Sequence, residues 1–460
     1  MTDKVAKAPP IPYRPAVPAP REKPAGIAEL LWLSWTDPLR IWSNRHFEEP
    51  ILYGDTRLGR AMAVNDPAAL REVLVDKAGD FHKDDLQRRV LGPMIAEGLF
   101  MAEGDDWRRM RRILAPLFNP RRTAASSGQM KAVAQARIAT WPKAGGVISI
   151  DQEMTRLTFE ILSATLFSGA LGGEADDFEK ALNAFVGAAA RIDPLDVIGA
   201  PAWIPRIGRV LAGGAGAFFQ RRVGELVVER RAILAKGGEA PDDLLTALLK
   251  AQDPETGVGL TDTQVASNIL TFILAGHETT ARALGWTLYL LARSPHVLAE
   301  LVREADALDL GKPDWADALP WTTAAFEEAM RLFPPAPVFT RMAMKETTIA
   351  GRRMRPGTVM LIVPWVLHRH RRLWDDPDAF KPERFLPGAR ESIDRFAYIP
   401  FGAGPRVCIG ASFAQQEALI ALTTIVRGFH LEPADASQPT PTHRITLRSK
   451  EGIRLKVTPR

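Results

Sequence analysis

The sequence predicts a mainly α-helical fold with a minor β portion. Apolar residues recur every three or four positions through much of the middle of the 460-residue chain, as in helices with one buried face. Segments with a strand-like pattern are short and lie toward the two ends. From residue 36 onward the chain contains no linker, low-complexity tract or internal repeat. We therefore expect residues 36–460 to form a single domain, preceded by an arm over residues 1–35.

The arm differs in composition from the rest of the chain. Seven prolines lie between Pro9 and Pro24, which predicts an extended, polyproline-like segment. The apolar run from Ile27 to Trp35 either docks on the protein's own surface or lies in a membrane interface. No stretch approaches the roughly 20 apolar residues of a membrane span, and the N-terminus lacks the order of a secretory signal.

The elements after the arm follow from local patterns. We expect a β-hairpin over Ile51 to Val64 with its turn at Gly54-Asp55, then a helix that begins at Asp66-Pro67. Helical periodicity covers Arg108 to Phe118, Met154 to Phe167, Phe178 to Arg191, Gly214 to Ala235 and Trp321 to Phe333. Further strands are expected at Thr347 to Ala350, Val359 to Pro364, Ile445 to Leu447 and Ile453 to Val457.

One predicted helix is unusually long. Thr261 and Gln264 have the spacing of a capping box, and the helical pattern then continues without proline to Arg293. Such a helix is roughly 45 Å long, comparable to the diameter of the whole molecule, and its sequence is apolar enough to be buried. Its centre, residues 275–280, nevertheless contains a glycine and a cluster of polar side chains. Polar residues in the middle of a buried helix indicate a functional site.

Charge and cysteine content exclude several classes of protein. The chain has 59 Lys+Arg and 54 Asp+Glu, and a net charge of +5 suits a local patch for an acidic protein partner better than nucleic-acid binding. The only cysteine is Cys408, so no intramolecular disulfide can form and multi-thiolate metal sites are implausible. A reducing, cytoplasmic location is expected.

Cys408 lies in an unusual loop, residues 401–410, with a helix expected from Ala411. Gly402, Gly404 and Gly410 would let the backbone approach a flat partner closely, and the helix N-terminus favours the thiolate form of the cysteine. A thiolate held in this way is either a nucleophile or a metal ligand. The loop contains no histidine to serve as the base that a nucleophile needs.

The loop resembles the heme-binding signature F-x-x-G-x-R-x-C-x-G of the cytochrome P450 family of heme-thiolate monooxygenases, and every fixed position matches. Other landmarks of the family follow in the right order across nearly the whole chain: Trp107-x-x-x-Arg111, Ala275-Gly276-x-Glu278-Thr279-Thr280, Glu328-x-x-Arg331 and Pro382-Glu383-Arg384-Phe385. The resemblance implies the cytochrome P450 fold, with one long central helix over heme b (iron protoporphyrin IX) and small antiparallel sheets.

The resemblance also implies the roles of individual residues. Cys408 would be the iron ligand, and a thiolate ligand favours cleavage of the O–O bond. The other positions that match heme-binding residues are Trp107, Arg111, Ala275, Gly276, Arg341, Phe401, Arg406 and Gly410. Glu328, Arg331 and Arg384 would form a buried network that braces the cysteine loop, the alternative being an ordinary surface salt bridge.

The catalytic pair implied by the resemblance is Glu278 and Thr279, which would relay protons for oxygen activation. In the alternative interpretation Thr279 bonds back to a carbonyl one turn earlier. His277 is out of phase with Thr279, so we expect it to lie outside the coordination sphere of the iron. Substrate contacts are expected from Phe272, Ala275, Ala336, Val338 and Phe339, together with residues 88–101, 181–211 and 448–452, which implies a sizeable hydrophobic substrate.

These residues imply a monooxygenase that inserts one oxygen atom from O2 into a C–H bond of a hydrophobic small molecule. A G-x-G-x-x-G motif is absent, so electrons are expected from a ferredoxin- or flavodoxin-type partner with an NAD(P)H-dependent reductase. The six arginines that would form a landing site for this partner, or otherwise a solvated surface, are Arg108, Arg109, Arg111, Arg112, Arg121 and Arg122. The alternative functions are a peroxide-driven peroxygenase and a non-catalytic, heme-dependent ligand sensor.

Overall fold

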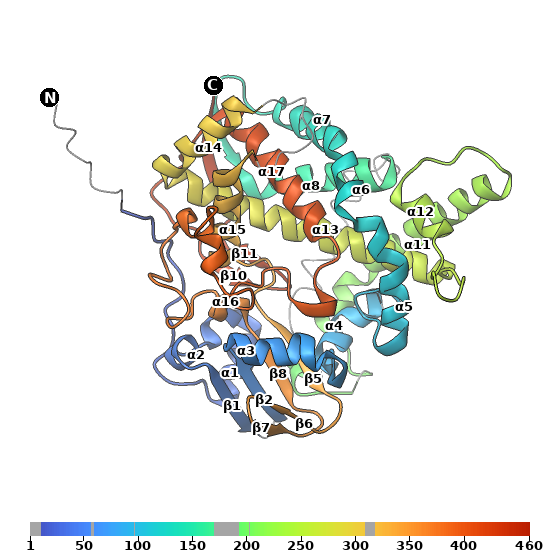
Figure 1. Ribbon diagram of the computed structural model, residues 1–460, viewed down its shortest axis with the longest axis vertical. Helices are drawn as coiled ribbons and strands as arrows, with labels where there is room; N and C mark the ends of the chain where they lie inside the picture. The colour runs from blue at the N-terminus through green and yellow to red at the C-terminus, as the bar shows by residue number, and fades with distance from the viewer. Residues whose placement is uncertain (1–10, 57–58, 96, 170–192, 202, 309–317) are drawn as a thin grey trace.

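The predicted long helix, α13 (Asp262–Ala292), crosses the whole molecule (Figure 1). In the computed structural model, which describes residues 11–56, 59–95, 97–169, 193–201, 203–308 and 318–460, it has 31 residues. The Thr261 hydroxyl accepts a hydrogen bond from the Gln264 amide at 3.1 Å, and the Gln264 side chain accepts one from the Thr261 amide at 3.2 Å. The predicted capping box is therefore present.

Helices make up most of the structure around α13. Those toward the N-terminus are α1 (Ile27–Thr36), α2 (Asn44–Glu48), α3 (Pro67–Arg71), α4 (Asp85–Ile95), α5 (Gly104–Leu114), α6 (Pro120–Ala125), α7 (Ser127–Ile138) and α8 (Ile150–Phe167). The later ones are α10 (Pro194–Val197), α11 (Ile207–Ala235), α12 (Leu244–Lys250), α14 (Pro295–Ala307), α15 (Pro320–Leu332), α16 (Pro364–Leu367) and α17 (Ala411–Gly428). The helix predicted over residues 178–191 lies outside the described residues.

The strands form four small sheets. They are β1 (Ile51–Thr56), β2 (Gly59–Val64), β3 (Phe81–His82), β4 (Gly146–Ser149), β5 (Phe339–Ala343), β6 (Thr347–Ile349), β7 (Arg352–Met354), β8 (Val359–Ile362), β9 (Phe429–Pro433), β10 (Pro441–His443), β11 (Leu447–Ser449) and β12 (Arg454–Pro459). The sheet orders are β1-β2-β8-β5-β3, β4-β12-β9, β6-β7 and β10-β11. All paired strands are antiparallel except β2 and β8, which are parallel.

One predicted turn and one predicted strand differ from the structure. Gly54 pairs with Ala61 inside β1, because the hairpin continues to Thr56 and reverses before Gly59, whose φ of +121° only glycine adopts readily. Residues 444–446, part of the strand expected over 445–447, form the turn between β10 and β11. The Arg444 amide donates to the Thr446 carbonyl at 3.0 Å, so β11 begins only at Leu447.

The described residues form four hydrophobic cores, and the two larger ones include the central helix. The main core combines the C-terminal half of α13 with α7, α14, α15 and α17, and the second core combines its N-terminal half with α5, α8, α11 and α12. A third core lies under the five-stranded sheet. Because α13 belongs to both larger cores, its central turns are held rigidly from both sides. Among the described residues, no helix has both the length and the apolar character needed to cross a bilayer.

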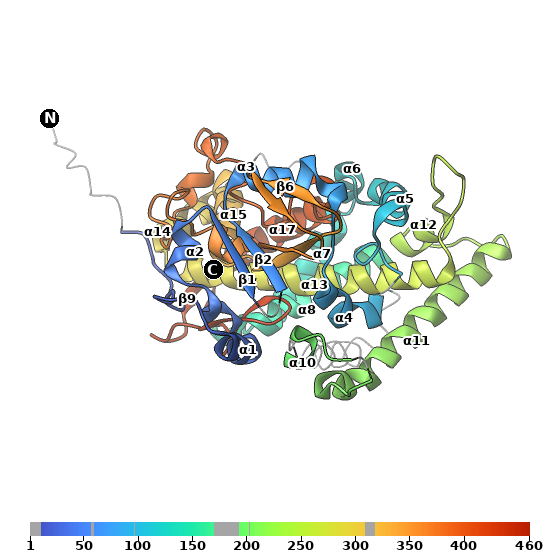
Figure 2. The ribbon, with the colours of Figure 1, turned by 90° about the horizontal axis from the view of Figure 1, so that it is seen from below.

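The described part of the proline-rich arm packs on the molecule. Residues 11–20 have no regular secondary structure, but Tyr13 and Val17 pack against the main core. The Tyr13 hydroxyl is hydrogen bonded to the Tyr289 hydroxyl of α13 at 2.7 Å. In α1, Leu33 is buried, whereas Trp32 is 62% exposed. Figure 2 shows α1 beside α10 at one edge of the molecule.

Candidate active site

The loop before α17 has a fixed backbone geometry. The Cys408 amide donates to the Phe401 carbonyl at 2.9 Å and closes the loop. Gly402 and Gly404 have φ values of +72° and +73°, which side chains disfavour. A Cβ on Gly404 would also overlap the carbonyl oxygen of Leu74, so no other residue fits there. The loop therefore presents Cys408 from a backbone that passes very close to its neighbours.

Two opposing effects act on the pKa of the Cys408 thiol. Burial by the surrounding protein raises the pKa of this thiol, while a hydrogen bond from the Gly410 amide and the nearby Arg111 guanidinium act in the opposite direction. Both of these groups stabilise a negative sulfur, and an iron ion would do so further. Cys408 therefore has the surroundings of a thiolate ligand.

The central turns of α13 have one open side. Ala275 is exposed and Thr279 is partly exposed, whereas the helix is otherwise mostly buried from Asn268 to Ala292. Residues four apart lie on the same helix face, so these two define one accessible stripe. The Thr279 hydroxyl donates to the Ala275 carbonyl at 2.6 Å, which is the local bond of the alternative interpretation. Its oxygen can still accept a hydrogen bond from another group.

Glu278 lies away from this stripe and is buried. Its Oε1 atom accepts a 2.7 Å hydrogen bond from the Thr446 hydroxyl, forms a close ion pair with Arg448 and lies 3.6 Å from Nε of Arg282. Burial opposes ionisation, but the two arginines and the hydroxyl together hold the pKa of Glu278 below its usual range. The acid of the predicted catalytic pair is therefore an ionised carboxylate at neutral pH.

Gly276 and His277 face α8. A Cβ on Gly276 would lie 2.8 Å from Cδ1 of Leu162, so the glycine allows α8 to approach α13 closely. The His277 ring is buried with its edge against Phe159, and neither ring nitrogen has a hydrogen-bond partner among the described residues. Burial lowers the pKa of His277 to about 4. His277 is thus a neutral packing residue, away from the open stripe as its phase predicts.

A group of cations lies beside the cysteine loop. The Arg406 guanidinium stacks on the Trp107 ring at 4.4 Å, donates to the Ala102 carbonyl at 3.1 Å and forms an ion pair with Glu103. Lys83 lies 3.1 Å from the same carboxylate. Arg341, which is partly buried in β5, adds a third positive charge close to Lys83 and Arg406.

The cations repel one another. Burial and the nearby Arg406 lower the pKa of Lys83 to about 7, and the same two causes lower the pKa of Arg341 to about 10. Such shifts mark a site that would be stabilised by additional negative charge. A heme carries two propionates, and the combination of a thiolate with an excess of buried cations fits that group. Lys83 would then join the predicted Arg341 and Arg406 as a propionate partner.

No local pattern in the sequence marks Lys83. Its neighbour Asp84 makes the segment look like an ordinary solvated charge pair, and the pairing of β3 with β5 that brings it near Arg341 is a long-range contact. Glu103 also has no local pattern that would mark it in the sequence. Its carboxylate also accepts from the Lys83 backbone amide at 2.9 Å, which ties the start of α5 to the end of β3.

The structure brings Glu328, Arg331 and Arg384 together. The side chains of Glu328 and Arg331 are completely buried and form two hydrogen bonds of 2.6 and 2.8 Å. Arg331 also donates to the carbonyls of Pro377 at 2.7 Å and Ala379 at 3.0 Å, and Arg384 approaches Glu328 to 3.5 Å. The network therefore joins α15 to the irregular chain that leads into the cysteine loop.

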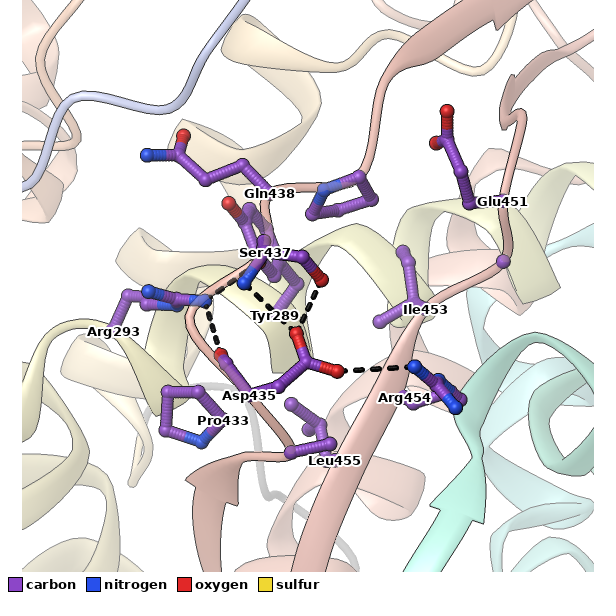
Figure 3. Close-up of a pocket in the computed structure, with 13 residues that line it drawn as sticks. Tyr289, Arg293, Pro433, Asp435, Ser437, Gln438, Glu451, Ile453, Arg454 and Leu455 are labelled. Carbon is purple, nitrogen blue, oxygen red and sulfur yellow. Dashed lines mark hydrogen bonds and ion pairs between the residues drawn. The ribbon is translucent and has the colours of Figure 1, made fainter.

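The expected pocket residues lie at different depths. Phe272 is buried in the second core with its ring against Phe118, whereas Val338 and Phe339 are partly buried and Ala336 is exposed. Residues 181–192 of the expected pocket lie outside the described residues. Gly452 lines a different cavity of about 320 Å³ beside Tyr289, shown in Figure 3. Tyr289 is ten residues from Thr279 along α13, so this cavity lies about 15 Å along the helix from the open stripe.

Most of the arginine cluster has partners within the protein. Arg112 forms two hydrogen bonds to the carboxylate of Asp253, at 3.0 and 2.9 Å. Arg109 donates to the Gly259 carbonyl before α13 and to the Gln264 side chain in its first turn. Arg108 and Arg122 pair with exposed carboxylates. These interactions neutralise part of the basic surface expected for a redox partner.

Together, the buried central helix with one open stripe, the thiolate loop and the cation group define a heme-thiolate protein. The chain belongs to the cytochrome P450 family, whose model matches residues 28–457. It is 34% identical to cyclooctatin synthase of Streptomyces melanosporofaciens, over 77% of each chain, and 32% identical to pentalenene oxygenase of Streptomyces avermitilis, over 86% of this chain and 87% of that protein. The crystal structure of the cytochrome P450DA heme domain superposes with a TM-score of 0.80 at 28% identity, covering 97% of this chain and 99% of that one. The protein is thus a heme-dependent monooxygenase.

Proposed function

We propose that this enzyme hydroxylates a C–H bond of a hydrophobic small molecule with one oxygen atom from O2. The observation that carries the proposal is the Cys408 thiol, which receives a hydrogen bond from the Gly410 amide at the start of α17. When heme is bound, its thiolate-ligated iron supplies the chemistry that cleaves O2. Every other requirement falls on the protein: holding the substrate, excluding water and delivering protons.

The Thr279 hydroxyl is the proposed proton-handling group on the open stripe. Because it donates to the Ala275 carbonyl, its oxygen can accept a hydrogen bond from a water or an acid on the accessible side. Glu278 is the proposed acidic partner, with its carboxylate held by Arg448 and Thr446. Glu278 is the neighbour of Thr279 in the chain, and water would have to carry protons between its buried carboxylate and the hydroxyl.

The proposed substrate is an alicyclic hydrocarbon or its alcohol. The relatives named for pentalenene and cyclooctatin favour this class, and the predicted pocket residues Val338 and Phe339 are apolar. We further propose that a separate ferredoxin or flavodoxin with its NAD(P)H-dependent reductase delivers the electrons. Arg121, which is exposed and follows α5, is a candidate contact for an acidic partner surface.

The first test is the absorption spectrum of the dithionite-reduced protein with carbon monoxide. A Soret band strongly shifted to the red is expected from a thiolate opposite the carbon monoxide, and Cys408→Ser should abolish it. A band at the position of histidine-ligated heme in the unaltered protein would overturn the proposal. Reconstitution with a ferredoxin, its reductase and NADPH, scored by hydroxylated product, then tests the reaction itself.

A further inference from the structure

Two carboxylates and two arginines form a buried network between α13, α8 and the β10–β11 hairpin. Glu278 and Arg282 come from α13, Asp151 from the first turn of α8 and Arg448 from β11. Arg282 bridges the two acids: its Nη1 lies 3.2 Å from Oδ1 of Asp151 and its Nε lies 3.6 Å from Oε1 of Glu278. All four side chains are at most 21% exposed.

The network is balanced in charge, with two positive and two negative groups. Removing either acid would leave two buried cations facing one carboxylate. Burial and Arg282 lower the pKa of Arg448 while Glu278 raises it, but a guanidinium stays charged in either case, so Arg448 needs a carboxylate partner here and Glu278 supplies it. The negative charge of Glu278 is therefore needed to balance the two arginines, whether or not the residue also takes part in catalysis.

Contacts to the hairpin backbone extend the network. Thr446, in the turn between β10 and β11, donates its hydroxyl to Glu278 at 2.7 Å. Asp151 accepts the Ile453 amide at 2.6 Å just after the hairpin, and the Ile150 amide donates to the Ile453 carbonyl at 2.9 Å. The chain from Thr446 to Ile453 is thus tied to α13 and α8 at three points.

The tethered turn carries one apolar side chain toward the interior of the protein. Ile445, next to Thr446, is partly buried and packs against the second core, which also contains Phe272. The hydrogen bond from Thr446 to Glu278 therefore fixes the position of Ile445 relative to the helix that carries the open stripe. A shift of the turn would therefore move Ile445 relative to α13.

We propose that Glu278 is a positioning residue for the substrate pocket, whose ion pair with Arg448 and hydrogen bond from Thr446 hold the β10–β11 turn and Ile445 against α13. The link to substrate rests on the proposed function. The mechanical part of the proposal, in which Glu278 holds the β10–β11 turn against α13, does not. It is also separate from proton delivery, because it uses Glu278 only as a fixed negative charge. Glu278 thus couples the shape of the pocket to the turn of α13 that carries Thr279.

Hydrogen exchange of residues 441–449 in the purified holoenzyme tests the mechanical part. Glu278→Gln and Arg448→Met should each speed exchange of these amides about tenfold or more, because each leaves a buried charge without its partner. Thr446→Val, which removes one hydrogen bond and keeps all charges, should produce a smaller increase. Glu300→Gln, in an exposed ion pair with Arg303, is the matched control and should leave this segment unchanged.

Spectral titration with two azole probes tests the link to the pocket. Imidazole is small, whereas 4-phenylimidazole carries a ring that must fit the pocket walls. The Kd for 4-phenylimidazole relative to imidazole should change about fivefold or more in Glu278→Gln and Arg448→Met, and in the same direction in Thr446→Val. A pure proton-relay role would leave this ratio unchanged.

The outcomes separate the two proposals. Unaltered exchange of the hairpin in Glu278→Gln would overturn the positioning role, whatever the activity. Should Glu278→Gln fail to fold, Thr446→Val alone decides: faster exchange with a changed Kd ratio supports the proposal, and no change in either contradicts it. If neither azole produced a heme spectrum in the unaltered protein, the proposed function would fail, while the exchange data would still decide whether Glu278 holds the hairpin.

Discussion

The backbone amide of Ile399 donates a 3.0 Å hydrogen bond to Nε2 of His368, and both residues are fully buried. His368 is in turn held by Arg331, which donates to its carbonyl at 2.7 Å. Burial and the neighbouring arginines lower the pKa of His368 to about 3, so the ring is neutral and Nε2 can accept. A continuous chain of contacts therefore runs from Glu328 through Arg331 and His368 to the residues just before the cysteine loop.

The first prediction concerns this histidine. His368→Leu leaves the Ile399 amide without an acceptor in the core, which should lower the free energy of unfolding by about 1–3 kcal/mol and reduce heme content after purification. His368→Gln offers a carbonyl oxygen in a similar position and should lose less. Urea unfolding and the ratio of Soret to protein absorbance measure both effects. Equal losses in the two variants would mean that the ring's volume, not its hydrogen bond, matters.

The second prediction separates two demands on the cysteine loop. Gly402→Ala has only an unfavourable φ to overcome, since no atom lies within 4 Å of its Cβ, and should cost about 1–2 kcal/mol. Gly404→Ala has a similar φ and in addition would place a carbon against the Leu74 carbonyl. It should therefore displace the loop and prevent stable heme binding. Heme content of the two variants, measured side by side, gives the answer, and equal retention of heme would contradict the close approach seen here.

The third prediction is a pH dependence of stability. The pKa of His277 is about 4 in the folded protein, against the ordinary histidine value of 6.5 that it regains on unfolding, so between these values the unfolded chain binds more protons. The free energy of unfolding must then fall as the pH falls through this window. His277→Phe, which keeps a ring against Phe159, should reduce the slope by about 1.4 kcal/mol per pH unit near pH 5. An unchanged slope in His277→Phe would show that His277 is protonated when folded.

The helices could be predicted from the sequence because their signals are local. The capping box at Thr261, the apolar spacing and the N-cap glycine before α17 all lie within a few residues of the element that they define. The cysteine loop was equally visible, since its glycines and Cys408 are contiguous. The turn after β1 was misplaced because Gly54 resembles a turn residue, whereas the register with β2 places the reversal further along.

Residues that act through distant contacts were not predictable. Lys83, Glu103, His368 and Arg448 carry no local pattern, and each finds its partner at least 20 positions away in the chain. Glu278 was identified by its place beside Thr279, but its ion pair with Arg448 depends on how the C-terminal hairpin folds back onto α13. A single sequence shows the chemical type of each side chain, but its contacts with distant residues become known only from the tertiary structure.

The fourth prediction concerns heme retention. Lys83 has a pKa of about 7 in the protein, and a propionate beside it would favour the charged amine, so heme binding should take up a proton above pH 7. Heme affinity should accordingly fall as the pH rises from 7 to 9. Lys83→Met should release heme about tenfold faster to a scavenging apoprotein, because a charge-assisted hydrogen bond contributes about 1.5–3 kcal/mol. Lys83→Arg stays charged at all these pH values and should flatten the dependence; a slope that survives in Lys83→Arg would assign it to another group.

The last prediction tests the open stripe of α13. The Thr279 hydroxyl donates to the Ala275 carbonyl, which leaves its oxygen free to accept a hydrogen bond from a water held for proton delivery. Thr279→Ala removes this acceptor without disturbing the buried side of the helix. The amount of product per NADPH should fall about fivefold to tenfold, with hydrogen peroxide released instead, since one ordered hydrogen bond contributes about 1 kcal/mol or more. Thr279→Ser keeps the hydroxyl and should retain most of the coupling.

The measurement is NADPH consumed against product and peroxide formed, with a ferredoxin and its reductase as electron source. Coupling that is unchanged in Thr279→Ala would show that the hydroxyl serves only its bond to Ala275, and proton delivery would then have to be assigned to other groups.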